Sequence, residues 1–88
     1  QNEKVVVIPR IQTKTELQEA IDNFDTVVLM KIISVMDIIN TIIDQNKHSI
    51  TYAERLGTNE QFITNSWETA NQRETPYFSL MIIKKTKK

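Results

Sequence analysis

The sequence predicts a small α/β domain with a mixed, mainly parallel-centred sheet of about five strands flanked by helices. Short β-branched runs alternate with two stretches of helical periodicity in the first half of the chain. The 88 residues suffice for one domain and not for two. Hydrophobic residues make up 40% and charged residues 25% of the chain, a balance typical of a globular protein.

The first half of the chain contains two predicted strands with a helix between them. Val5–Ile8 is a β-branched run that ends at Pro9, which has no N–H to give a strand ladder. Thr15 is a candidate helix cap with Gln18 three residues later. Apolar residues then follow at the spacing of one helix face: Leu17, Ala20, Ile21 and Phe24. Residues 26–33 are almost continuously apolar and are interpreted as a strand buried on both faces.

A second helix is predicted to follow this strand. Ser34 and Asp37 have the spacing of a capping box. The apolar residues behind them share one helix face: Val35, Ile38, Ile39, Ile42 and Ile43.

The second half of the chain is predicted to add further strands. Residues 49–53 and 77–83 have strand composition, and Gly57 marks a turn between them. Residues 60–67 are ambiguous, because they are rich in β-branched and aromatic residues but lack clean alternation. A short polar helix is expected at residues 68–73, and the ambiguous segment and the last strand are candidates for an antiparallel pair.

Composition argues against several classes of function. Lys and Arg balance Asp and Glu at 11 each, so no overall field attracts nucleic acid or a membrane, and no apolar run approaches the length of a membrane span. The lack of cysteine excludes disulfides and thiolate metal sites, and is compatible with the cytoplasm. A single glycine excludes a glycine-rich phosphate loop within these residues. The only histidine, His48, is interpreted as an exposed loop residue, so no metal ligand or catalytic base is assigned.

The ends of two predicted strands form the best candidate site. Ligands of open α/β sheets bind beyond the carboxyl ends of the strands. One predicted strand ends near Met30, and the next leads into the turn at Gly57. As parallel neighbours, these strands would bring together a soft thioether, a tight turn and backbone amides, which suits an apolar heterocycle or thioether ligand. The alternative is that Met30 fills the core and Gly57 only makes a turn.

Three segments resemble, in order, the C-terminal half of the tetrapyrrole methylases: FDTVVLMK, ITYAERLGTNEQFI and PYFSLMIIKK. The ending PYFSL is most similar to the precorrin-2 or cobalt-precorrin-2 C(20)-methyltransferases of cobalamin biosynthesis. The resemblance implies that residues 1–88 are a single C-terminal domain of a two-domain, S-adenosylmethionine-dependent enzyme. It further implies that the N-terminal domain, with most of the tetrapyrrole trough, lies outside these residues. The full-length protein is then expected to be a cytoplasmic homodimer, and this fragment alone is expected to be inactive.

The resemblance also implies which positions contact the cofactor. The Met that ends the first matching strand is Met30. The turn after the next strand places a contact at Leu56 or its neighbour Gly57, and the last strand contributes Ser79 and Leu80. Lys31 departs from the small residue that follows the Met in some relatives. No residue matches a catalytic acid or base of the family, and no metal is implied.

Two other interpretations stay open. In the first, the chain is part of another tetrapyrrole methylase branch, with a different methylated carbon. In the second, it is a non-enzymatic α/β module that binds a protein through its Ile-rich helices and basic tail. That tail, KKTKK, is interpreted as a solvated terminus, with a phosphate-binding arm as the alternative.

Overall fold

The computed structural model describes residues 3–86, without the side chain of Ser34. Five strands in this range form one sheet, accompanied by three α-helices and a short 3₁₀ helix, η1. In chain order the elements are β1 (Val5–Ile8), α1 (Lys14–Asn23), β2 (Thr26–Met30), η1 (Ile32–Ser34), α2 (Met36–Ile42), β3 (His48–Glu54), β4 (Phe62–Thr64), α3 (Trp67–Gln72) and β5 (Ser79–Lys85).

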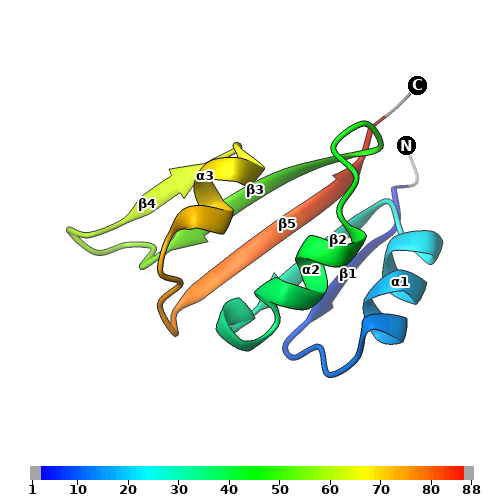
Figure 1. Ribbon diagram of the computed structural model, residues 1–88, viewed down its shortest axis with the longest axis horizontal. Coiled ribbons are helices and arrows are strands. Elements are labelled where there is room, and N and C mark those ends of the chain that lie inside the picture. The colour runs from blue at the N-terminus through cyan, green and yellow to red at the C-terminus, as the bar shows by residue number, and fades with distance from the viewer. Residues whose placement is uncertain (1–2, 87–88) are drawn as a thin grey trace.

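The strands lie in the order β1-β2-β5-β3-β4 (Figure 1). Only β1 and β2 pair in parallel, whereas β5 is antiparallel to both β2 and β3, and β4 is antiparallel to β3. The small α/β class and the mixed sheet are therefore confirmed, but the prediction of a mainly parallel centre is wrong. The last strand enters between β2 and β3, which local sequence patterns do not reveal. Only the middle of the ambiguous segment is a strand, β4, which pairs with β3 and not with β5, and its last residue, Trp67, begins α3.

The insertion of β5 still leaves one predicted feature in place. Because β2 and β3 both run antiparallel to β5, they run in the same direction, and their carboxyl ends reach the same edge of the sheet. The amino end of β5 reaches that edge too. This edge carries the candidate site.

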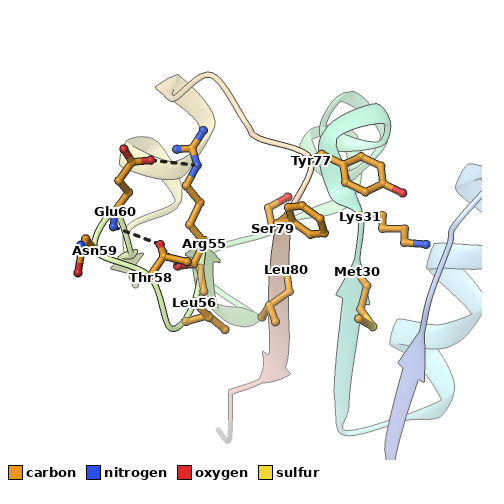
Figure 2. Close-up of a pocket in the computed structure, with 12 residues that line it drawn as sticks. Met30, Lys31, Arg55, Leu56, Thr58, Asn59, Glu60, Tyr77, Ser79 and Leu80 are labelled. Atoms are coloured by element: carbon orange, nitrogen blue, oxygen red, sulfur yellow. Dashed lines mark hydrogen bonds and ion pairs between the residues drawn. The ribbon is translucent and has the colours of Figure 1, made fainter.

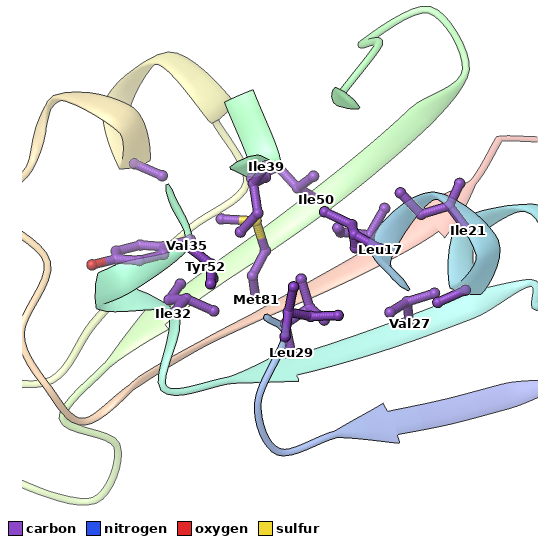
Figure 3. Packing of buried hydrophobic residues seen from close by; sticks show 14 of the residues in the cluster. Leu17, Ile21, Val27, Leu29, Ile32, Val35, Ile39, Ile50, Tyr52 and Met81 are labelled. Carbon is purple, nitrogen blue, oxygen red and sulfur yellow. The ribbon is translucent and has the colours of Figure 1, made fainter. Parts of the chain in front are cut away.

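All three α-helices cover one face of the sheet (Figure 1). Strand residues that alternate toward the helices pack with Leu17 and Ile39 in a core from which water is almost fully excluded (Figure 3). The strand residues of this core are Val27, Leu29, Ile50, Tyr52, Met81 and Ile83. The domain is thus a two-layer α/β structure.

The caps of the first two helices differ from the prediction. Helix α1 is capped by Thr13, not Thr15, because the Thr13 hydroxyl accepts a hydrogen bond from the Glu16 N–H at 3.1 Å and the Glu16 carboxylate accepts one from the Thr13 N–H at 3.2 Å. Helix α2 begins at Met36, after a Val35 cap without a side-chain hydrogen bond. The predicted capping box of Ser34 and Asp37 involves a side chain outside the described part of the chain.

Two strand boundaries near the site also differ from the prediction. Strand β2 ends at Met30, because Lys31 adopts a left-handed backbone with φ of 53° and residues 32–34 form η1. Strand β5 begins at Ser79 rather than Tyr77, so the Tyr77–Phe78 pair precedes the sheet. Both changes place residues beside the candidate site outside the strands.

Candidate functional site

A cavity of about 750 Å³ lies where β2 and β3 end and β5 begins (Figure 2). Its floor contains Met30, Leu80 and Ala53, which are neighbours in one row across the three strands. By strand alternation this row faces away from the helices, since Leu29, Met81 and Tyr52 face the core. The cavity therefore opens on the uncovered face of the sheet, at its edge.

The structure brings four of the five predicted cofactor positions together around this cavity. Met30 and Leu56 are 39% and 50% exposed, Leu80 is half-buried and Ser79 is buried, and all four line the cavity. Gly57 lies in the same loop but is not among the lining residues. Its φ of +82° instead makes it the turn residue, and its N–H donates to Oε1 of Gln61 at 2.8 Å.

Two non-glycine residues in left-handed conformations shape the cavity entrance. Lys31 follows β2 and Arg55 follows β3, with φ of 53° and 48°. The Lys31 N–H donates to the Ser79 carbonyl at 3.1 Å, and the Arg55 N–H donates to the Phe78 carbonyl at 3.0 Å. Such backbone conformations are uncommon for residues with a Cβ and cluster at binding sites. Here they turn the backbone away from the sheet after β2 and after β3, at the point where the cavity opens.

The loop after β3 forms a polar wall. The Thr58 hydroxyl donates to the Arg55 carbonyl at 2.7 Å and accepts from the Glu60 N–H at 3.1 Å. The Glu60 carboxylate lies 3.7 Å from the Arg55 guanidinium. Two basic residues line the cavity, Lys31 and Arg55. Arg55 is paired with Glu60, whereas Lys31 has no ion pair among the described residues.

Aromatic side chains form the opposite wall. Tyr77 and Phe78 contact each other edge to face, with ring centroids 5.2 Å apart. Phe78 is 74% exposed, and Nζ of Lys31 lies 6.0 Å from the centroid of the Tyr77 ring. The Ser79 hydroxyl donates to the Pro76 carbonyl at 2.9 Å, so its proton is already committed and it can only accept a hydrogen bond from a ligand.

A buried carboxylate lies behind the cavity, on the helix side of β3. Arg73 donates to both oxygens of Glu54, at 2.7 and 2.8 Å, and the Tyr52 hydroxyl donates to Oε2 at 2.5 Å. The bidentate contact with Arg73 lowers the pKa of Glu54. Burial, with the neighbouring carboxylate, raises the pKa of Tyr52 to about 12. The guanidinium of Arg73 also lies 3.7 Å from the centre of the Phe62 ring.

This cluster connects the two walls of the cavity. Glu54 precedes the loop of Arg55, and Arg73 follows α3 in the segment that leads to Tyr77. Sequence reasoning missed the cluster, although a signal for it was present. Ile50, Tyr52 and Glu54 alternate onto one face of β3, so a carboxylate was placed on the core side, where it needs a partner.

His48 is not the exposed loop residue that was predicted. It begins β3, is half-buried, and its Nδ1 accepts a hydrogen bond from the Asp44 N–H at 3.2 Å. Burial lowers the pKa of His48, although Asp44 opposes this shift. Within residues 3–86 no group of His, Asp and Glu side chains is arranged to hold a metal ion. None of the helices in that range has the length and apolar character needed to cross a membrane.

No protein-family model matches the chain, and no curated protein matches its sequence. The cavity and the residues around it therefore carry the functional inference.

Proposed function

We propose that this chain forms the cofactor-binding wall of an S-adenosylmethionine-dependent methyltransferase that acts on a cyclic tetrapyrrole. The target carbon in this proposal is C20 of precorrin-2 or cobalt-precorrin-2, in cobalamin biosynthesis in the cytoplasm. The observation that supports it is one cavity lined by four residues to which the resemblance assigns cofactor contacts: Met30, Leu56, Ser79 and Leu80. In this proposal an N-terminal domain outside these residues supplies the other wall and the tetrapyrrole trough.

The chemistry of the cavity suits this cofactor. Its volume of about 750 Å³ falls within the usual range of small-molecule sites. The thioether of Met30 and the side chains of Leu56 and Leu80 offer soft apolar contacts to an adenine ring and a sulfonium methyl group. Thr58 and Asn59 offer polar groups for ribose hydroxyls on the opposite side.

The reaction in this proposal is displacement at the sulfonium methyl group by a nucleophilic meso carbon of the macrocycle. Holding the two reactants in line within a closed cleft can supply roughly 7–11 kcal/mol of the barrier. The residues of this chain would contribute cofactor orientation and exclusion of water on one side. The isolated chain, with the cavity open to solvent, is therefore expected to bind the cofactor weakly and to transfer no methyl group.

A non-enzymatic interaction module is the second candidate, and the cavity rim favours it. Tyr77, Phe78 and Leu56 are 54%, 74% and 50% exposed, so the rim presents large apolar side chains to solvent. Such a rim would fit a protein partner, but it would equally fit the second domain of a methyltransferase. Ligand binding separates the two candidates.

Calorimetric titration of the chain with S-adenosylhomocysteine tests the proposal. We expect weak, saturable binding that Met30→Ala reduces severalfold, because the variant removes a side chain from the cavity floor. Met36→Ala is the matched control, since Met36 packs against the core from α2 and does not line the cavity. Another tetrapyrrole methylase branch would give the same result, whereas the interaction module predicts no binding to either the parent chain or the control.

A further inference from the structure

The charged side chains around the cavity are unevenly distributed. Lys31 lies beside Tyr77, whereas Arg55 and Glu60 lie on the opposite wall (Figure 2). The Arg55 guanidinium has two carboxylates nearby, that of Glu60 at 3.7 Å and that of Glu54 at 4.0 Å. No salt bridge within residues 3–86 involves Lys31. The cavity therefore has one wall on which the charges are balanced and one wall with an excess positive charge.

The backbone fixes the position from which the Lys31 side chain leaves the sheet. The left-handed conformation of Lys31 directly follows β2, and its N–H donates to the Ser79 carbonyl at 3.1 Å. This hydrogen bond ties Lys31 to the start of β5, next to the aromatic pair of Tyr77 and Phe78. Lys31 is thus held at the cavity rim by its backbone, while its flexible four-carbon stem lets the ammonium group adjust to a ligand.

The aromatic wall holds the Lys31 ammonium group only weakly. Its Nζ lies 6.0 Å from the centroid of the Tyr77 ring, at the outer limit of a cation–π attraction. A carboxylate can accept a charge-assisted hydrogen bond from an ammonium group at about 2.8 Å, which is a stronger interaction. The ammonium group is therefore available to an anionic ligand.

The other polar groups of the cavity determine how such a ligand is oriented. The hydroxyls of Ser79 and Thr58 both donate to backbone carbonyls, so they can only accept a hydrogen bond from a ligand. The Glu60 carboxylate disfavours an anionic group on the opposite wall. The exposed aromatic rings and the apolar floor suit a flat ring system. These features favour a ligand with its ring over the floor and its anionic group at Lys31.

We propose that Lys31 recognises a carboxylate, and that the cavity selects a flat apolar ring system that carries this group. The ring packs between the floor and the aromatic wall, and the carboxylate accepts a hydrogen bond from the Lys31 ammonium group. Applied to a methyltransferase, this assignment rests on the proposed function. The carboxylate then belongs either to the amino-acid part of the cofactor or to an acidic substituent of the macrocycle.

Two ligands of nearly the same shape test the proposal, 2-naphthoate and its neutral amide, 2-naphthamide. Titration of the isotope-labelled chain, followed by amide chemical shifts, gives both affinities and shows that each variant is folded. We expect the parent chain to prefer naphthoate. Lys31→Met should weaken naphthoate binding about three- to five-fold, the scale of a partly exposed ion pair, and should leave naphthamide binding unchanged. Lys31→Arg retains the charge and should preserve the preference.

Lys14→Met is the matched control, since Lys14 is an exposed lysine at the start of α1 and does not line the cavity. We expect it to bind both naphthalene ligands as the parent chain does. Four results would each overturn the proposal: no binding of naphthoate to the parent chain, unchanged naphthoate affinity in Lys31→Met, an equal loss for both ligands, or an equal loss in Lys14→Met.

A second pair of ligands identifies the source of the carboxylate. S-adenosylhomocysteine carries the amino-acid carboxylate, and 5′-methylthioadenosine lacks it. If Lys31→Met weakens the binding of the first ligand only, Lys31 recognises the cofactor. If the variant binds both ligands as the parent chain does, the carboxylate recognised by Lys31 is that of the macrocycle. Failure of both ligands to bind the parent chain would refute the proposed function, and the naphthoate result would still decide whether Lys31 recognises a carboxylate.

Discussion

Replacement of Glu54 by Gln tests how strongly the buried cluster stabilises the fold behind the cavity. The Glu54 carboxylate is 1% exposed and accepts three hydrogen bonds, two from Arg73 and one from Tyr52. The amide oxygen of Gln can accept the two hydrogen bonds that Oε2 of Glu54 accepts from Tyr52 and Arg73. Its NH₂ group then takes the place of Oε1 and faces the second N–H of Arg73, which is also a donor. It therefore loses at least one charge-assisted hydrogen bond, which costs about 1.5–3 kcal/mol.

We expect Glu54→Gln to lower the free energy of unfolding by about 2–3 kcal/mol at neutral pH, a large part of the total for a domain of this size. The midpoint of thermal unfolding should fall by roughly 10–20 °C. Urea and thermal unfolding followed by circular dichroism measure both quantities. Glu60→Gln is the control, because that carboxylate is 78% exposed and its pairing with Arg55 is on the surface, and we expect no measurable change.

The effect of this substitution should depend on pH with a definite sign. The folded-state pKa of Glu54 is lowered, so its contribution to stability is present above the unfolded pKa, about 4.3, and is lost as the pH falls through the folded value. The difference between the parent chain and Glu54→Gln should therefore shrink in acid. Equal stabilities at neutral pH, or a difference that stays constant down to acid unfolding, would refute this reasoning.

Three further predictions concern the cap, the phenol and the turn. Thr13→Ala should cost about 1 kcal/mol in urea unfolding and Thr15→Ala much less, because only Thr13 caps α1, and the reverse order would contradict the observed cap. The pKa of the Tyr52 phenol is raised to about 12, so the protonated phenol should stabilise the fold below the unfolded pKa of about 10. This contribution should be lost as the pH rises toward 12. Ultraviolet titration that finds every tyrosine ionised near 10 would contradict this prediction. Gly57→Ala should cost about 1–2 kcal/mol from backbone strain alone, since nothing lies within 4 Å of the added Cβ, and an unchanged urea midpoint would show that the turn relaxes freely.

The local elements of the fold were largely predictable, because hydrophobic periodicity and cap residues act over a few positions. Strand β1 and the apolar face of α1 were predicted correctly from Val5–Ile8 and from Leu17, Ala20 and Ile21. The order of the strands was not predicted, since it depends on the position of β5, which comes last in the sequence but lies between β2 and β3. A strand that enters between two others leaves no trace in its own alternation, so the antiparallel centre was missed.

The candidate site was predictable in part for a related reason. The carboxyl end of β2 at Met30 and the turn after β3 are local features, and β2 and β3 share a direction even though they are not neighbours. The wall formed by Tyr77 and Phe78 was missed, because the last strand was predicted to begin two residues too early, at Tyr77 rather than Ser79. The left-handed conformations of Lys31 and Arg55 carry no sequence signal, as neither is glycine, asparagine or aspartate.

Mapping of amide chemical shifts during titration with S-adenosylhomocysteine tests the central proposal most directly. The proposal predicts saturable shifts at Met30, Leu56 and Leu80, with the amides of α1 unchanged on the far side of the sheet. Met30→Ala should weaken the shifts, and Met36→Ala should preserve them. Shifts scattered over the helices, or no shifts at millimolar ligand, would contradict the assignment of this cavity to the cofactor.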